Sequence, residues 1–436
     1  MPHTSRSCIR VIDRLTLLRL TLTGWERCAS LRTVTPPVPA ADATLIVSNG
    51  HAEDLIGAAL ARELLAARPE PLLALPLVGA GRAYGNVAAV QGPLLNLPSG
   101  GFPFGSLNNL RADLRAGLLT TSLRQWWAAR SLGPQVNRVV VVGDTYALLV
   151  GTLAARAVAG PRGPRLPLTH LQPLVSTHYA RGMGVRSHLR ELNALGANLF
   201  MPWEVALARR ARRVYTRDAP SAASLARRGV NASYRGSFAM DILPAPERDL
   251  PELPTGRPVL ALVPGQRGDA DFSLPLMLEA AAHLPEWQAA VAFANDWAAL
   301  PVPAGWQLTG AGDQTRWLQR GDVRVLVLRG AFAAVARRAT MALGTAGTAS
   351  EQLAGLGVPV IGFPTPGPQY VAGFARRQAR LLGRALTVTP ADPCEVVRAV
   401  RTLFDHPQRL KAAQADGRER IGPPGALRAI AAELDG

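Results

Sequence analysis

The sequence predicts an α/β protein with two parallel-sheet domains, and three observations support this prediction. Short apolar runs alternate with helical patterns over residues 41–243, and the alternation starts again over residues 256–436. Such alternation is typical of βαβ units, whose strands pair in parallel. The segment between the two series, residues 244–255, is rich in proline and acidic residues, so we predict a linker there. Glycine-rich turns follow several of the apolar runs, at the sheet edge where open α/β folds bind ligands.

The composition supports a folded protein with an anionic partner. The chain has 436 residues, of which 48% are hydrophobic and 18% charged, a profile typical of globular proteins. Its formal net charge of +17 favours nucleotides, phospholipid headgroups or nucleic acid as partners. We exclude nucleic acid because no arginine-rich block is interleaved with aromatic residues.

The cysteines indicate a reducing compartment. Cys8, Cys28 and Cys394 are widely spaced and form no pair typical of a metal site, so we expect neither zinc nor a disulfide framework. No uninterrupted apolar run reaches the ~20 residues that span a bilayer. We therefore predict a cytoplasmic protein, in peripheral contact with the inner face of the plasma membrane.

Residues 1–40 differ from the predicted folded body. Arginines interrupt an apolar series, which excludes a signal-peptide core. Val11, Leu15, Leu18 and Leu22 share one helical face, so a basic amphipathic helix is one interpretation. A poorly ordered leader is the other.

The first predicted strand, residues 43–48, leads into a turn that carries His51, Glu53 and Asp54, and a helix follows. The carboxylates are suited to complement the dipole of that helix. A histidine at the edge of a sheet is free to act as an acid or a base. Both interpretations apply to this turn.

Asp144 follows the predicted strand at residues 138–142 and faces the same sheet edge as His51. It is either the cap of the next helix or a catalytic carboxylate. The glycine loop at residues 79–85 lacks the spacing of a dinucleotide fingerprint, so we exclude an NAD site. The pattern does not place the segment that holds His170 and His178.

The stretch over residues 340–370 contains the strongest predicted ligand site. A strand at residues 341–343 enters a Gly/Thr turn, a helix starts at residue 349, and a second strand covers residues 358–363. The free N–H groups of a helix N-terminus suit a phosphate. An ordinary βα turn is the alternative interpretation.

Several residues of this stretch have predicted roles in binding. Glycines 344 and 347 allow the backbone to approach an anion, while Thr345 and Thr348 add hydroxyl donors. Glu351 is placed to accept hydrogen bonds from a sugar hydroxyl. Arg267 follows the predicted strand at residues 259–263, so its planar fork would face the same anion and suits a diphosphate.

Two successive βα domains with these turns resemble the layout of GT-B glycosyltransferases, in which two Rossmann-like domains face a central cleft. Over residues 43 to about 430 the chain resembles lipid-A-disaccharide synthase and its related proteins. Five segments carry the resemblance: SNGHAEDLIGAAL, VGAGRAYG, VVVGDTYALL, LVPGQRGD, and GTAGTASEQLAGLGVPVI followed by GPQY. The last segment is also similar to the donor-nucleotide motif of the peptidoglycan UDP-GlcNAc transferase. His51 resembles the histidine in the Gly-Gly-His loop of that enzyme.

The resemblance implies a metal-independent hexosyltransferase that uses a UDP-sugar as co-substrate and needs no other cofactor. Its catalytic candidates are Asp144, His51 and Asp54. The residues implied to bind the donor are Arg267, Gly344, Thr345, Gly347, Thr348, Glu351, Gln352 and Gln369. The implied partners are a nucleotide-sugar donor, a lipid or glycolipid acceptor, an anionic membrane surface and a second copy of the chain.

Two other functions fit the same pattern. One is a UDP-GlcNAc 2-epimerase, which would need the nucleotide but no lipid. The other is a non-catalytic protein that binds a nucleotide-sugar or a lipid on the same scaffold.

Overall fold

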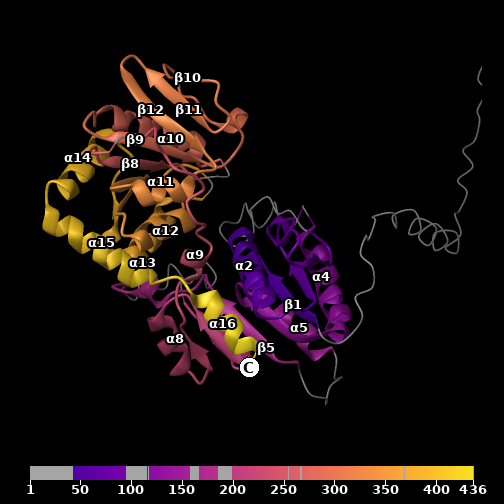
Figure 1. Cartoon of the computed structure of the whole chain (residues 1–436). Helices are drawn as coiled ribbons and strands as arrows, with labels where there is room; N and C mark the ends of the chain where they lie inside the picture. The colour runs from indigo at the N-terminus through magenta and orange to yellow at the C-terminus, as the bar shows by residue number, and fades with distance from the viewer. Residues whose placement is uncertain are drawn as a thin grey trace, which may run out of the picture. The chain divides into compact units, whose positions relative to one another are not determined.

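The structure is a computed structural model, and Figure 1 shows the whole chain. The residues that it describes are 43–94, 115, 117–157, 166–184, 199–253, 255–265, 268–367 and 369–435. The predicted leader and Arg267 lie outside them.

The first sheet has seven described strands, all parallel, in the order β3-β2-β1-β4-β5-β6-β7. The strands are β1 (Ala43–Ser48), β2 (Leu72–Pro76), β3 (Ala89–Val90), β4 (Val136–Val142), β5 (Leu168–Gln172), β6 (Arg213–Thr216) and β7 (Ala232–Ser233). Every residue of β1 is buried, because helices cover both faces of the sheet.

The described helices of this half are α2 (His51–Ala67), α4 (Leu118–Leu132), α5 (Thr145–Arg156), α7 (Pro202–Ala208), α8 (Ala219–Ala226) and α9 (Phe238–Asp241). Side chains of α2 pack with Ile46, Val140 and Val142 in one core cluster. Helix α5 covers the other face, where a Cβ on Gly151 would lie 2.2 Å from a methyl group of Val141. Glycine at this position lets α5 approach the strand closely.

The second sheet has eight described strands in the order β10-β11-β12-β9-β8-β13-β14-β15. They are β8 (Val259–Val263), β9 (Gln288–Phe293), β10 (Gln307–Thr309), β11 (Thr315–Arg320), β12 (Val323–Arg329), β13 (Met341–Gly344), β14 (Val360–Gly362) and β15 (Leu386–Val388). The pairs from β12 to β15 are parallel, whereas β10 and β11 extend one edge as antiparallel strands that the sequence pattern did not predict.

The helices that follow in the chain are α10 (Ala270–Ala282), α11 (Phe332–Arg338), α12 (Thr348–Leu356), α13 (Ala372–Leu382), α14 (Pro393–Phe404), α15 (Pro407–Ile421) and α16 (Ala426–Asp435). None of the helices in the described part of the chain combines the length and the apolar character that crossing a bilayer requires.

The last helix of the chain packs on the first sheet. Leu427 and Ile430 of α16 lie in the core cluster of that sheet, together with side chains of α2. The carboxylate of Asp241 accepts hydrogen bonds from the N–H groups of Gly425 and Leu427, the latter at 2.7 Å. These bonds hold the N-terminus of α16 against α9, which the local sequence pattern could not indicate.

The segment predicted as a linker is packed along part of its length. Leu250 and Leu253 are buried in a core cluster of the second sheet. The carboxylate of Glu247 accepts hydrogen bonds from the N–H groups of Ala333 at 3.0 Å and Ala334 at 2.9 Å, and so caps α11. The boundary at residues 244–255 stays a prediction.

Candidate functional site

The strand order of each sheet reverses at one point, and the predicted site residues lie there. In the first sheet β1 lies between β2 and β4, and in the second sheet β8 lies between β9 and β13. Ligands of open α/β sheets bind outside the carboxyl ends of the strands at such switch points. The turns after β1 and β4 carry His51 and Asp144, and the turns after β8 and β13 carry Gly265 and Thr345.

The turn between β13 and α12 has the features of an anion site. Gly347 is the N-cap of α12, so no side chain caps the free N–H groups there. Thr345 is 2% exposed and Ser350 is fully buried, and neither hydroxyl has a hydrogen-bond partner in the described structure. Buried hydroxyls are normally satisfied, so this pair makes the turn a candidate site for a ligand that accepts hydrogen bonds.

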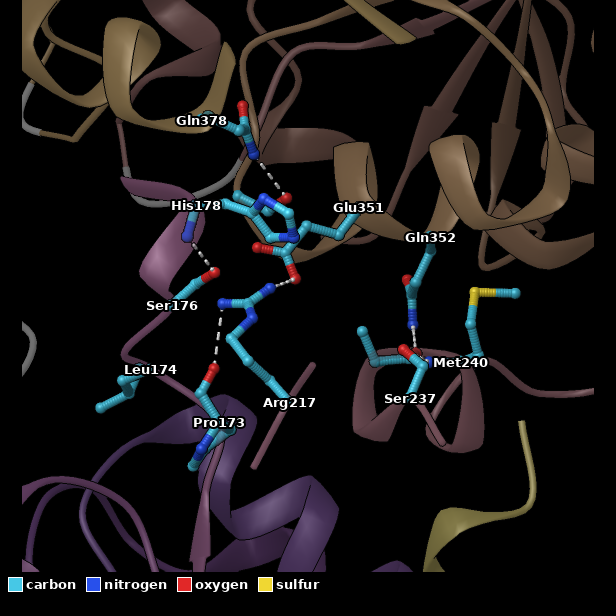
Figure 2. A network of polar contacts seen from close by, with 12 residues as sticks. Pro173, Leu174, Ser176, His178, Arg217, Ser237, Met240, Glu351, Gln352 and Gln378 are labelled. Carbon is cyan, nitrogen blue, oxygen red and sulfur yellow. Dashed lines mark hydrogen bonds and ion pairs between the residues drawn. The ribbon is translucent and has the colours of Figure 1, made fainter. Parts of the chain in front are cut away.

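The backbone of this turn is held from α13. The side-chain amide of Gln378 donates to the carbonyl oxygens of Ala346 at 3.0 Å and Gly347 at 2.9 Å. Figure 2 shows Gln378 and one of these bonds. The hydroxyl of Tyr370 donates to the other end of the Gln378 amide at 2.8 Å, so the orientation of the amide is fixed. The carbonyls are therefore turned toward α13. The N–H group of Thr345 donates to the carbonyl oxygen of Val263 at 3.1 Å, so the donors that remain for an anion are the first N–H groups of α12.

The turn after β8 lies against the same place. Gly265 has a φ of +81°, and a Cβ there would lie 3.0 Å from the carbonyl oxygen of Thr345. A carboxylate oxygen of Asp269 accepts hydrogen bonds from the N–H groups of Gln369 at 3.3 Å and Tyr370 at 3.2 Å. The Gly265 turn, the Thr345 turn and the loop that ends at Gln369 thus meet. The prediction that Arg267 faces the same anion as Thr345 requires that their two turns lie together.

Glu351 lies one turn into α12 and is already engaged. Its carboxylate pairs with the guanidinium of Arg217 at 2.8 Å, and both side chains are largely buried (Figure 2). Arg217 follows β6 and also donates to the carbonyl oxygen of Pro173 at 3.0 Å and the hydroxyl of Tyr179 at 3.2 Å. A ligand hydroxyl that binds Glu351 must share or replace this ion pair.

Thr348 and Gln352 also lie on α12. Thr348 is the first residue of the helix and is half-buried. The amide of Gln352 donates to the carbonyl oxygen of Ala239 at 2.8 Å, so it faces α9 (Figure 2). Gln352 therefore anchors α12, while Thr348 lies at its open end.

Asp144 is the N-cap of α5. One carboxylate oxygen accepts hydrogen bonds from the N–H groups of Tyr146 at 2.9 Å and Ala147 at 3.2 Å. Burial raises the pKa of Asp144, and these bonds together with the amide of Asn49 oppose the rise. Gly143 before it has a φ of +148°, and a Cβ there would lie 2.0 Å from the side-chain oxygen of Asn49. The position of the carboxylate thus depends on glycine at residue 143.

The two catalytic candidates after β1, His51 and Asp54, differ in exposure to solvent. Helix α2 starts at His51, earlier than predicted, so Asp54 lies within its first turn. Asp54 is 3% exposed and accepts a 2.6 Å hydrogen bond from the hydroxyl of Ser48, which in turn accepts one from Tyr84 at 2.8 Å. Burial raises the pKa of Asp54 to about 6, and the bond from Ser48 opposes the rise. His51 is exposed, so of the two it is the one that solvent and a substrate can reach.

His170 lies on β5, in the segment that the sequence pattern did not place. Its Nε2 lies 2.9 Å from the carbonyl oxygen of Gly143, and burial lowers the pKa of the imidazole to about 4. A neutral imidazole that donates from Nε2 fits this contact. His170 therefore supports the backbone next to Asp144.

Glu204, in the first turn of α7, was missed by the sequence analysis. It is 3% exposed and accepts a 2.7 Å hydrogen bond from the amide of Gln172. The oxygen of that amide accepts from the N–H groups of Leu174 and Val175, which fixes its orientation. Burial raises the pKa of Glu204 to about 7, and the negative charge of Asp144 adds to the rise. An acidic residue within the apolar segment MPWEVALA was the available signal.

Two carboxyl groups therefore share the edge after β4 and β5. Glu204 is held at the end of β5 by Gln172, and Asp144 follows the neighbouring strand. Such a pair can hold a proton near neutral pH. In the part of the chain that the structure describes, no group of three or more His, Cys, Asp or Glu side chains is placed to hold a metal ion.

Comparison by sequence finds no relative: no family model matches the chain, and no curated protein matches it. The resemblance to lipid-A-disaccharide synthase therefore stays a prediction.

Solved structures share the fold. The calicheamicin glycosyltransferase CalG4 matches with a TM-score of 0.56 and 16% identity over 91% of this chain and 98% of its own. The UDP-GlcNAc 2-epimerase from Neisseria meningitidis, solved with bound UDP-GlcNAc, matches with a TM-score of 0.52 and 13% identity over 90% of this chain and 100% of its own. MurG from Acinetobacter baumannii matches with a TM-score of 0.52 and 15% identity over 90% and 99%. The predicted fold class, two Rossmann-like parallel-sheet domains as in GT-B enzymes, is confirmed.

Proposed function

We propose that this protein transfers a sugar, of the N-acetylglucosamine type, from a UDP-sugar to a lipid-linked acceptor. The observation that carries the proposal is the open N-terminus of α12. Free N–H groups, the unpartnered hydroxyls of Thr345 and Ser350 and the Gly265 turn meet there, one helical turn from Glu351. A diphosphate next to a ribose matches this order of anion site and carboxylate. The fold supports the proposal, since solved glycosyltransferases share it.

In this proposal the diphosphate lies on the backbone at Gly344 and Gly347. Thr345 and Thr348 donate hydroxyl hydrogen bonds to it, and Arg267 adds a positive charge. Glu351 accepts from the ribose hydroxyls once Arg217 yields part of its ion pair. Gln352 and Gln369 complete the donor site, the first as an anchor of α12 and the second on the loop that Asp269 holds.

The reaction needs a base for the acceptor hydroxyl and stabilisation of the leaving diphosphate. Asp144 or His51 takes the proton, while buried Asp54 supports the turn that carries His51. A raised pKa makes the carboxylate of Asp144 a stronger base than an exposed one. The N-terminus of α12 and Arg267 stabilise the charge on UDP, which is why we propose transfer without a metal ion.

A second candidate is epimerisation of a UDP-sugar without any acceptor. The carboxyl group of Glu204, with a pKa raised to about 7, favours it because proton transfer at a sugar carbon needs groups that titrate near neutrality. A solved UDP-GlcNAc 2-epimerase also shares the fold. A non-catalytic nucleotide-sugar binder is the third candidate.

The first test is a thermal-shift titration with UDP, UDP-GlcNAc, GDP and NAD. A ligand that binds only the native state stabilises it by RT ln(1 + [L]/Kd), so we expect shifts with uracil nucleotides alone. Absence of any shift would refute the donor site.

The second test measures free UDP from UDP-GlcNAc with and without a lipid extract. Release only in the presence of lipid indicates transfer, conversion of the sugar without lipid indicates epimerisation, and binding without turnover indicates the non-catalytic protein.

A further inference from the structure

Helix α4 carries an exposed apolar stripe. Leu119 is 66% exposed, Leu123 60% and Trp127 78%. Their spacing of four residues places them on one face of the helix. The buried residues of the same helix, which lie on the opposite face, are Gln125, Ala129 and Leu132. A large apolar face toward solvent on a helix that already packs with its other face indicates an interaction surface.

The charged side chains of α4, and of Arg115 just before it, are all positive. Arg115, Arg124 and Arg130 are exposed, and residues 117–132 contain no acidic side chain. An apolar face flanked by arginines is typical of helices that lie in the interface of an anionic membrane. Tryptophan suits the same location, because its ring is apolar and its N–H is polar. With 15 residues, α4 would lie along the membrane surface.

Helix α4 is tied to the edge of the first sheet that carries Asp144. On the opposite face of α4, the amide of Gln125 donates to the carbonyl oxygen of Leu77 at 2.7 Å, just after β2. Its oxygen accepts a 3.0 Å hydrogen bond from the hydroxyl of Tyr146, two residues after Asp144. The turns of α4 that carry Leu123 and Trp127 are therefore fixed to the carboxyl edge of the first sheet.

We propose that α4 binds an anionic phospholipid membrane. Leu119, Leu123 and Trp127 enter the boundary between headgroups and acyl chains, and Arg124 and Arg130 bind the lipid phosphates. A lipid acceptor then reaches Asp144 directly from the membrane surface. The docking surface stands on its own observations, whereas acceptor delivery rests on the proposed function.

Co-sedimentation of the full chain with vesicles tests the docking surface. Vesicles of phosphatidylcholine are compared with vesicles that also contain phosphatidylglycerol, at low and high salt. We expect binding to the anionic vesicles, weakened by salt. The variant Leu119→Ser/Leu123→Ser/Trp127→Ser should bind on the order of a hundredfold more weakly, because three apolar side chains no longer leave water. The matched control is Phe272→Ser, since Phe272 is 47% exposed on α10.

Quenching by lipids with brominated acyl chains locates the contact. Trp127→Phe should lose most of the quenching that membrane binding causes, while Trp203→Phe should keep it, although Trp203 of α7 is also 54% exposed. Equal quenching in both variants would overturn the proposal. Equal vesicle binding by wild type and the triple variant would also overturn it, as would equal binding to neutral and anionic vesicles. A third contrary outcome is a wild-type protein that binds no vesicles and forms a dimer, with the triple variant monomeric.

Acceptor delivery has a separate readout, free UDP from UDP-GlcNAc with a polar lipid extract. The triple variant should lose release with extract in vesicles but keep it with extract in detergent. Release from vesicles that equals that of wild type would overturn acceptor delivery through α4. No release by wild type under any condition, with vesicle binding intact, would refute the proposed function and leave the docking surface in place.

Discussion

The substitution Glu204→Gln tests the buried carboxyl group that the sequence analysis missed. Burial raises the pKa of Glu204 from 4.5 to about 7, with the charge of Asp144 as a further cause. In the unfolded chain the carboxyl group ionises near pH 4.5. Between pH 4.5 and about pH 7 the folded state therefore keeps a proton on Glu204 that the unfolded state has lost. The stability that this gives is complete below pH 4.5 and is lost as the pH rises through about 7.

The size of the effect follows from that difference in pKa. Each unit corresponds to about 1.4 kcal/mol, so ionisation of Glu204 costs the folded state on the order of 3 kcal/mol above neutral pH. Glutamine stays neutral, and its oxygen can still accept the hydrogen bond from Gln172. At about 2–4 °C per kcal/mol for a domain of this size, the variant should melt several degrees above wild type in alkaline buffer.

The assay is thermal unfolding of both proteins at several values between about pH 5 and about pH 8.5. The difference between their midpoints should grow with pH, because Asp54 and the other groups titrate alike in both proteins. The exposed Asp249→Asn substitution is the matched control and should track wild type. A constant difference between Glu204→Gln and wild type across this range would refute a carboxyl group that titrates near neutrality.

The remaining predictions concern the two sheet edges. Asp144→Asn should keep the cap of α5, since asparagine caps as well as aspartate, but lower turnover by about 10²–10⁴-fold without weakening UDP binding; unchanged turnover excludes the role as base. Arg217→Gln should tighten UDP binding severalfold in calorimetry, because Glu351 loses its competing partner, and should lower the melting temperature, because the largely buried carboxylate is left unpaired; weaker binding would instead make Arg217 part of the donor site. Thr345→Val should weaken UDP binding by about three- to tenfold without lowering the melting temperature, because its hydroxyl has no partner in the described structure. Gly143→Ala should destabilise the fold by at least about 2 kcal/mol in urea unfolding, because alanine strongly disfavours a φ of +148°; a neutral effect would contradict the backbone geometry at this turn.

Local pattern was enough for most of the strands that position the site. The strands at residues 43–48 and 259–263 have the predicted bounds, because continuous apolar runs between turn residues are buried on both faces. The β5 strand, LTHLQ, escaped prediction since polar side chains interrupt it. His170 and Gln172 are nevertheless buried there, and they form hydrogen bonds with Gly143 and Glu204. Those partners are distant in sequence, so no local pattern could indicate them.

The sequence by itself determined the alternation of strands and helices and the glycine turns at the carboxyl ends of the strands, because periodicity and backbone freedom are local properties. It also placed Asp144 before a helix and Thr345 in the turn that leads into α12. Only the tertiary structure decided that Arg217 pairs with Glu351, that Glu204 is buried beside Asp144, and that α16 packs on α2. Charge pairing, desolvation and packing depend on which distant residues meet, and that depends on the folded chain as a whole.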